Sequence, residues 1–524
     1  MNNKTISFST ILILIFGTLN PLSGFAQAGD LDFTFNYDGK VTTDISSEDY
    51  ANTIAIQTDG KIVVAGRSTT VLGQSDFSVV RYDSIGNLDN TFNQDGKVTT
   101  DFFSWTDGAK SIAIQPDGKI VVAGDCDSVF TFSDFAVVRY NEDGSLDNSF
   151  GVNGKVSTDF NISGDFVSAL ALQSDGKIVV VGTSSNVSEN DNFALARYYA
   201  NGNLDASFGD NGKVTTDFNS TMDIGNAVFI QADGKIVVAG NSKNATNNDF
   251  ALARYNMDGS LDSSFGLNGK VTTPIGLFDD VATSVSLQND GKIVVAGFYE
   301  PDNLYPDFAI VRYNNDGSLD YTFGSDGKVT SPTGFGSDYG YAISIQSDGK
   351  IVVAGQISVP AQPSGRFGVA RYNANGSVDY SFGTEGKVTT AIGLLYDVGK
   401  ALTIQTDGRI VVAGYTNNGT NNDFAVVRYL GANPNGLTVE EPQKTRLFFY
   451  PNPFTHATFM RLDRDANNTT LLISNIFGQR VKRINHIPNQ IITLYRDDLP
   501  SGIYFVQITQ DDKVISTDKL VIVD

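Results

Sequence analysis

One eight-residue string recurs along this chain, and it constrains the fold more than any other feature. The string Asp-Gly-Lys-Ile-Val-Val-Ala-Gly begins at Asp59 and returns six times, with small changes, at intervals of 57 to 59 residues. Two further strings keep the same interval, namely Asp-Phe-Ala-Val-Val-Arg-Tyr and Leu-Asp-x-x-Phe followed by Gly-Lys-Val-Thr-Thr. Because all three occur seven times, the sequence predicts seven copies of one unit that pack against one another.

Each unit predicts four β-strands and no helix. In the second copy the strands are expected at residues 111–115, 119–124 and 135–140, with a fourth that includes 146–150 and 155–158. The Asp-Gly turn between the first two strands is a strong hairpin signal, and no stretch has the periodicity of a helix. The sequence therefore predicts an all-β fold, a seven-bladed β-propeller with four antiparallel strands per blade.

The phase of the repeat predicts how the ring closes. The repeated region begins with a fourth-strand string at residues 31–43 and ends after three strands at residues 402–429. The first strand is therefore expected to pair with these three and complete the last blade. Each third strand carries an Arg, and an Asp follows eight residues later in six of the seven copies. Arg428 has no such Asp, so we expect it to pair with Asp32 and form the structural closure of the ring.

The three strings resemble the delta-60 repeat, over about residues 29–429. This resemblance implies a propeller-like body and no common chemistry.

The two ends of the chain predict further segments. Residues 1–28 have a basic start, a short apolar run and the exit Ala26-Gln27-Ala28, as in a secretory signal peptide. Residues 29–430 are predicted to form the propeller, 431–444 a linker and 445–524 a small immunoglobulin-like β-sandwich. Its strands are expected at residues 447–450, 459–462, 471–476, 491–495, 503–509 and 514–523.

Several C-terminal motifs resemble the type A sorting domain of type IX secretion. These motifs are Tyr450-Pro-Asn-Pro, the Gly478 turn after Ser474-Asn-Ile-Phe, Leu499-Pro-Ser-Gly-Ile-Tyr and Lys519-Leu-Val. The resemblance implies export across the outer membrane of a Bacteroidota-type cell by the type IX machinery. The domain is usually removed, and the protein is then released or attached at the cell surface. The alternative is an ordinary accessory immunoglobulin-like domain.

Composition narrows the chemistry. The net charge is −22, and the ten basic and ten acidic residues from Leu430 onward cancel, so the whole net charge belongs to the region before Leu430 and nucleic acid is not an expected partner. No apolar stretch of the mature chain is long enough to span a membrane.

The two histidines, His456 and His486, follow the propeller, which excludes histidine-based catalysis in it. Cys126 is expected in a loop and unreactive, so no catalytic residue is assigned.

An Asp recurs just before each first strand. Around a central channel these seven could form a ring that holds a cation such as Ca²⁺; no other cofactor is expected. The alternative, which we favour, is that each Asp bonds backbone amides within its own blade. The ring consists of Asp49, Asp107, Asp165, Asp223, Asp280, Asp338 and Asp397.

The loops that differ between copies carry the expected binding residues. They hold aromatic side chains that suit a glycan or a surface protein, although these could equally pack their own loops. The sequence thus favours a secreted or cell-surface, non-catalytic binding or scaffold protein. The alternative is a carbohydrate-active hydrolase or lyase with a carboxylate pair among Glu48, Glu189 and Glu300. The aromatic residues are Phe102, Phe103, Trp105, Phe130, Phe132, Tyr299, Tyr305, Tyr339 and Tyr396.

Overall fold

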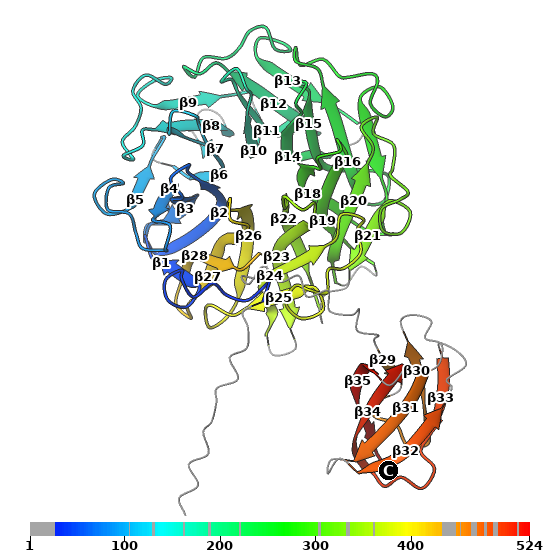
Figure 1. Ribbon diagram of the computed structural model, residues 1–524. Helices are drawn as coiled ribbons and strands as arrows, with labels where there is room; N and C mark the ends of the chain where they lie inside the picture. The colour runs from blue at the N-terminus through cyan, green and yellow to red at the C-terminus, as the bar shows by residue number, and fades with distance from the viewer. Residues whose placement is uncertain are drawn as a thin grey trace, which may run out of the picture. The chain divides into compact units, whose positions relative to one another are not determined.

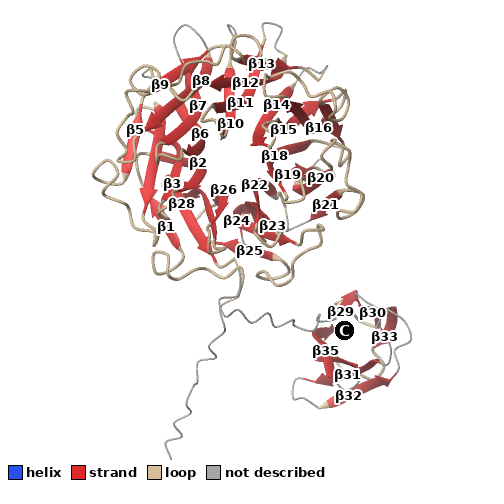
Figure 2. Ribbon diagram, turned by 45° about the horizontal axis from the view of Figure 1, so that its top comes forward, coloured by secondary structure: helices blue, strands red, loops and turns tan. Residues whose placement is uncertain are grey.

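Every element of the computed structural model is a β-strand (Figures 1 and 2). The structure describes residues 27–103, 105–127, 132–160, 163–186, 190–218, 222–301, 305–331, 336–359, 362–431, 447–450, 452–462, 469–475, 479–485, 491–510 and 513–524. The expected signal peptide, apart from its last two residues, lies outside these ranges. Among the described residues, no helix has the length and apolar character needed to cross a membrane.

Seven four-stranded antiparallel sheets form the blades of the first compact unit. Blades 1 to 3 consist of β2 (Glu48–Ile56), β3 (Ile62–Thr69), β4 (Ser75–Tyr82) and β5 (Lys97–Thr100); β6 (Asp107–Ile114), β7 (Ile120–Asp127), β8 (Ser133–Tyr140) and β9 (Lys155–Thr158); and β10 (Asp165–Leu172), β11 (Ile178–Ser185), β12 (Asp191–Tyr198) and β13 (Lys213–Thr216).

The remaining four blades repeat this order. Blades 4 to 6 consist of β14 (Asp223–Ile230), β15 (Ile236–Lys243), β16 (Asn248–Tyr255) and β17 (Lys270–Thr273); β18 (Asp280–Leu287), β19 (Ile293–Tyr299), β20 (Asp307–Tyr313) and β21 (Lys328–Ser331); and β22 (Tyr339–Ile345), β23 (Ile351–Val359), β24 (Gln362–Tyr372) and β25 (Lys387–Thr390). Blade 7 consists of β26 (Asp397–Ile404), β27 (Ile410–Asn417), β28 (Asn422–Tyr429) and β1 (Lys40–Thr43).

The blades bury one another, which explains the apolar runs in each repeat. The second and third strands are buried on both faces; in β3 the first five residues, Ile-Val-Val-Ala-Gly, are all buried. Side chains of successive blades form a separate hydrophobic core at every junction, including that between blades 7 and 1, where Phe35 and Val64 meet Val411. The first strands line the central opening (Figure 1). Since a single small sheet cannot bury both faces, the ring supplies the missing partner surfaces.

The first described strand closes the ring, as predicted. β1 pairs antiparallel with β28, from Lys40 opposite Val427 to Thr43 opposite Phe424. Arg428 Nε lies 2.8 Å from Asp32 Oδ2, and both side chains are buried. Without β1, the outer edge of β28 would be left unpaired, and an open stack would leave the faces of blades 7 and 1 uncovered.

The repeated Arg links neighbouring blades. Arg254 of β16 contacts Asp262 at 2.7 Å, stacks on the ring of Phe265 and donates Nη1 to the backbone oxygen of Asn315 in the next blade. Lys235 from the Asp-Gly-Lys turn adds a second cation, 2.7 Å from Asp262. The equivalent Arg of every blade makes the same three contacts, which gives the repeated Arg, Asp, Phe and Lys a structural role.

Two sequence expectations were wrong in detail. The fourth strand of the second copy begins only at Lys155, because Asp147 turns the chain: its Oδ1 accepts the backbone N–H of Ser149, and Phe150 N–H bonds its carbonyl. Leu146 makes a single bridge to Tyr140. Cys126 lies inside β7, where it is buried, because that strand runs to Asp127.

The second compact unit is a separate two-sheet body. Its sheets consist of β29 (Leu447–Tyr450), β30 (Ala457–Leu462) and β33 (Ile491–Tyr495), and of β32 (Arg480–Asn485), β31 (Thr469–Asn475), β34 (Gly502–Gln510) and β35 (Lys513–Ile522). Both contribute to one core. Strand β32 was not predicted, because its side chains are largely exposed and charged and give no apolar signal. The immunoglobulin-like character of this unit stays a prediction.

Candidate functional site

The two faces of the propeller differ in how much they vary between repeats. The turns between first and second strands and between third and fourth strands carry the repeated motifs; we call this the turn face. The loops between second and third strands, and those that join successive blades, lie at the opposite strand ends because neighbouring strands are antiparallel. We call this the loop face.

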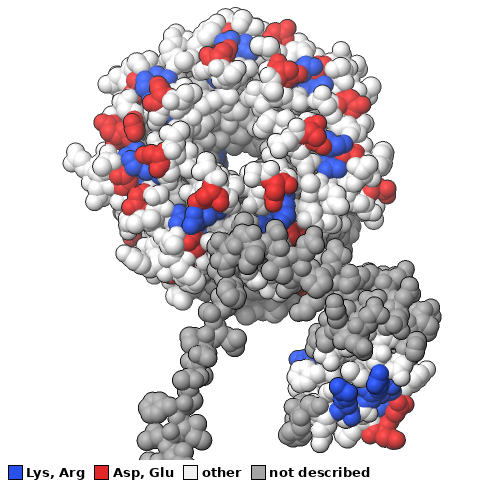
Figure 3. All heavy atoms as spheres, viewed as in Figure 1, with Lys and Arg blue, Asp and Glu red and all other residues white. Residues whose placement is uncertain are grey.

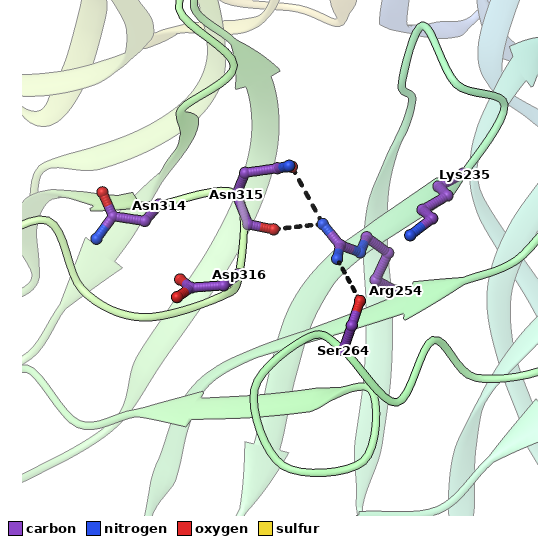
Figure 4. A pocket seen from close by; sticks show the side chains of 6 residues that line it. All are labelled: Lys235, Arg254, Ser264, Asn314, Asn315 and Asp316. Atoms are coloured by element: carbon purple, nitrogen blue, oxygen red, sulfur yellow. Dashed lines mark hydrogen bonds between the residues drawn. The ribbon is translucent and has the colours of Figure 1, made fainter.

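The turn face is occupied by structural ion pairs. Acidic and basic side chains lie next to one another in clusters spaced around the ring (Figure 3). Figure 4 shows a shallow pocket between blades 4 and 5, in which Arg254 donates to Asn315 and, at 3.3 Å, to Ser264 Oγ. The pocket is lined by Lys235, Arg254, Ser264, Asn314, Asn315 and Asp316. Since the same Arg joint recurs at every junction, this pocket does not mark a distinct site.

Four of the predicted aromatic residues are exposed on the loop face. Phe103 and Trp105 lie in the loop that joins blades 1 and 2, Phe132 precedes β8 and Tyr305 precedes β20. Their exposed fractions are 46%, 52%, 69% and 53% respectively. Large apolar side chains this exposed on variable loops are available to a ligand.

Four others are half-buried and pack within the propeller. Phe102 lies 5.1 Å from Phe77, Tyr339 lies 5.0 Å from Phe298 and Tyr396 lies 6.4 Å from Tyr415, measured between ring centroids. Tyr299 ends β19 and packs against a junction core. For these residues the packing alternative describes the observed contacts. Phe130 lies outside the described residues.

The seven recurring aspartates are buried at the start of the first strands. Six bond backbone amides of the loop that precedes their strand: Asp107 Oδ2, for example, accepts the N–H of Phe102 at 2.7 Å, and Asp280 accepts those of Ile275 and Gly276. Asp338 accepts the N–H of Ser358 in β23, at 2.7 Å, and residues 332–335 before it lie outside the described residues. Each Asp therefore stabilises, through hydrogen bonds to backbone amides, its own blade or the segment that leads into that blade.

Three of these aspartates lie in clusters that sequence reasoning missed. In each cluster, one oxygen from each of three carboxylates lies within 4.8 Å of the others. The additional members come from the start of a third strand and from the residue after a fourth strand of the preceding blade. We call these clusters carboxylate triads; they are Asp423, Asp44 and Asp49; Asp76, Asp101 and Asp107; and Asp134, Asp159 and Asp165. The signal was present in the Asp-Phe motif of the third strand and in the Asp that follows Thr-Thr or Ser-Thr at the end of the fourth strand.

The triads perturb the acidity of their members. Burial, together with the charges of Asp101 and Asp76, raises the pKa of Asp107 to about 7 despite the hydrogen bond from Phe102. Burial likewise raises the pKa of Asp165 to about 6, with Asp159 and Asp134 acting in the same direction. Close carboxylates without a counter-cation resist ionisation, because each new charge is placed beside another in a poorly solvated site.

The two candidate glutamates among the described residues, Glu48 and Glu300, do not form a catalytic pair with each other. Glu48 Oε2 accepts the side-chain amide of Asn422 at 2.7 Å, across the junction of blades 7 and 1. Glu300 follows β19 in blade 5, so these two glutamates belong to non-adjacent blades. Burial raises the pKa of the Cys126 thiol, which argues against a nucleophilic role. Glu189 lies outside the described residues.

Family models match most of the repeated body and the C-terminal unit. The model described as "Domain of unknown function (DUF5122) beta-propeller" matches seven segments: 57–92, 115–150, 173–208, 231–265, 288–323, 346–382 and 405–436. The model described as "Secretion system C-terminal sorting domain" matches residues 448–523.

Individual relatives are distant. Beta-agarase A of Zobellia galactanivorans is 34% identical over 82 residues, which is 15% of this chain and 15% of that protein. A Dyadobacter fermentans protein of unknown function has a TM-score of 0.39 at 14% identity, over 75% of this chain and 98% of its own. The polysaccharide lyase Uly1 has a TM-score of 0.42 at 12% identity, over 78% of this chain and 98% of its own.

Proposed function

Since the chain consists of seven repeats of the DUF5122 β-propeller family followed by a type IX secretion C-terminal sorting domain, we propose that it is a non-catalytic binding or scaffold protein of the cell exterior. The sorting domain engages the type IX machinery, and the propeller is the exported body. Its ligand is a glycan or a surface protein, bound on the loop face. Here residues 29–430 act as the binding domain, 431–444 as linker and 445–524 as the secretion domain.

One observation carries this proposal: Phe103, Trp105, Phe132 and Tyr305 are exposed on loops that differ between repeats, whereas the repeated Arg, Asp and Phe of the motifs are buried and build the ring. Trp105 and Phe132 belong to adjacent junctions, since one precedes β6 and the other precedes β8 of the same blade. Flat aromatic faces stack on sugar rings and anchor protein contacts with little loss of side-chain entropy. The net charge of −22 favours neutral glycans over polyanionic ones.

The alternative is a carbohydrate-active hydrolase or lyase, and the local identity to Beta-agarase A is the observation that favours it. Glycosidases need two carboxyl groups about 5–10 Å apart in one cleft. Glu48 and Glu300 come from non-adjacent blades and so do not meet this requirement. In each carboxylate triad only one of the three aspartates is exposed, which favours a structural or ion-binding role over contact with a sugar.

The test compares exposed aromatic residues on the two faces. Full-length protein is screened on immobilised agarose, cellulose, mannan and xylan and on outer-membrane proteins, and each positive is repeated with Trp105→Ala and Phe132→Ala. Loss of a central aromatic contact weakens binding by about tenfold or more, since such residues contribute about 2 kcal/mol. Tyr321→Ala and Tyr380→Ala are the matched controls, because these exposed tyrosines lie on the turn face and should leave binding unchanged.

Equal losses from both faces, or none from the loop-face variants, would contradict the loop face as the binding site. Release of reducing or unsaturated sugar ends from the same polysaccharides would support the alternative function, a hydrolase or lyase, whichever variants bind.

A further inference from the structure

The carboxylate triads have the same construction at three consecutive blade junctions. Between blades 1 and 2, Asp76 lies in β4 next to Phe77, which pairs with Thr100, so Asp101 follows beside it. Asp107 then enters from the first strand of the next blade. The junctions between blades 2 and 3 and between blades 7 and 1 place their aspartates at the same three positions. Each triad therefore joins two blades through three negative groups.

Each triad contains a buried carboxylate oxygen, and in the triad of Asp107 no described protein group satisfies it. Asp107 is 1% exposed; its Oδ2 accepts the N–H of Phe102, and its Oδ1 has no hydrogen-bond partner among the described residues. Oδ1 of Asp49 and of Asp165 is likewise buried, but Ser68 and Ser184 lie opposite these two aspartates and their hydroxyls act to lower the pKa of each. A buried charged oxygen left unpaired is costly, so a missing partner is expected beside Asp107, and the other two triads share its construction.

The junction between blades 6 and 7 shows which kind of partner fits. There the residues at the three positions are Arg366, Ala391 and Asp397, so two of the three carboxylates are absent. The Arg366 guanidinium lies beside the remaining carboxylate, with Nη1 2.9 Å from Asp397 Oδ2. At this junction the chain thus supplies its own cation to the remaining Asp. This shows that a positive charge fits beside the first-strand Asp.

The other three junctions lack a full triad. The corresponding residues are Asn192, Asp217 and Asp223; Asp249, Pro274 and Asp280; and Asp307, Pro332 and Asp338. With at most two carboxylates each, they serve as internal controls.

We propose that the three carboxylate triads each bind a Ca²⁺ ion that ties neighbouring blades together beneath the loop face. The ligands are carboxylate oxygens, which Ca²⁺ prefers, and waters complete its six to eight contacts. Asp44, Asp101 and Asp159 are exposed, so each site is open to solvent. Lys97, Lys155 and Lys213 approach from the same side but donate to the backbone oxygens of these three residues.

Two of the three ions would stabilise the closure of the ring and a loop that carries exposed aromatic residues. The triad of Asp423, Asp44 and Asp49 joins the last blade to the first. The triad of Asp76, Asp101 and Asp107 brackets the loop that carries Phe103 and Trp105. This inference goes beyond the proposed function, because ion binding is measured without any glycan or protein ligand.

Trp105, the only tryptophan of the chain, makes one triad directly observable. Tb³⁺, which substitutes for Ca²⁺ at oxygen sites, is added to the full-length protein and its luminescence is excited through Trp105. We expect sensitised emission that Ca²⁺ competes away and that falls at least tenfold in Asp101→Asn, whose side chain is exposed. Asp76→Asn is the second variant, should the first misfold. Asp249→Asn, at a junction without a triad, is the matched control and should leave the emission unchanged.

Equilibrium dialysis of the full-length protein with Ca²⁺ tests all three sites. The number of bound ions should fall by one in each of Asp44→Asn, Asp101→Asn and Asp159→Asn, and should be unchanged in Asp249→Asn. Absence of saturable Ca²⁺ binding at millimolar concentration would overturn the proposal. So would emission or stoichiometry that the triad variants leave unchanged.

Discussion

At the scale of single residues, each repeated side chain has a partner in its own or the neighbouring blade, and the blades that differ at one such position are informative. The position opposite the buried Asp on the second strand is Ser68, Ser184 or Ser242 in three blades, and Thr416 in blade 7 donates to Asp397 at 2.5 Å. In blade 2 this position is Cys126, which pairs with Asp107 in register. A thiol is a weak donor, which fits the unpartnered oxygen of Asp107.

A serine hydroxyl in place of the Cys126 thiol should give Asp107 a hydrogen-bond donor. Cys126→Ser places a donor opposite Asp107, and one hydrogen bond to a buried acceptor contributes about 1 kcal/mol. We expect the free energy of unfolding in urea to stay level or rise by about that amount, even though most substitutions of buried residues destabilise.

Cys126→Ala is the control, since it removes the thiol without adding a donor, and it should not stabilise. A Ser variant less stable than the Ala variant would show that the hydroxyl finds no partner at Asp107.

At the scale of elements, the first strand of each blade begins with an Asp whose burial raises its pKa. For Asp107 the value is about 7, and for Asp165 and Asp280 about 6, with burial the largest cause in all three. The folded state therefore holds these protons at a pH where the unfolded chain, with a pKa near 3.8, has released them. Because the folded state binds more protons between pH 4 and 7, its stability falls as the pH rises through that window.

Thermal unfolding in the presence of a chelator should follow this sign. We expect the midpoint to fall steadily from pH 4.5 to pH 7.5, each such Asp costing about 1.4 kcal/mol per pKa unit. The aspartates that pair with arginines, such as Asp89 and Asp379, have pKa values lowered by hydrogen bonds and neighbouring cations, despite burial. They titrate below this window.

Asp280→Asn should flatten the slope, because it removes one proton uptake at a junction without a triad. A midpoint of thermal unfolding that rises from pH 4.5 to pH 7.5 would contradict the raised pKa values of these aspartates.

At the scale of the whole molecule, closure depends on one strand and one ion pair supplied from opposite ends of the propeller. Arg428 binds Asp32 Oδ2, donates to Ser84 O in blade 1 at 2.6 Å and stacks on Phe35. The charges of Arg428 and Arg409 and hydrogen bonds from Thr34 lower the pKa of Asp32, although burial opposes this. The same joint occurs within continuous chain as Arg312 and Asp320.

Asp32→Ala and Asp320→Ala therefore separate the cost of a lost pair from the loss of closure. Both should destabilise the propeller by about 3–5 kcal/mol, because each leaves a buried Arg unpaired. Only Asp32→Ala should speed hydrogen exchange of β1 and β28, since only there can the chain end detach. Equal exchange of these strands in both variants would mean that the pair is not needed for closure.

Repetition in the sequence determined the blade number, the strand order and the closing strand, because apolar runs and turn residues act locally and recur with the unit. The ring then brings together groups that are distant in sequence, and these only the tertiary structure decided. Asp76, Asp101 and Asp107 each look like ordinary loop or strand-end residues, and they form a triad because two blades meet there. Likewise, Trp105 and Phe102 are near neighbours with equal apolar character, yet one is exposed and the other packs on Phe77, because burial depends on the neighbouring blade.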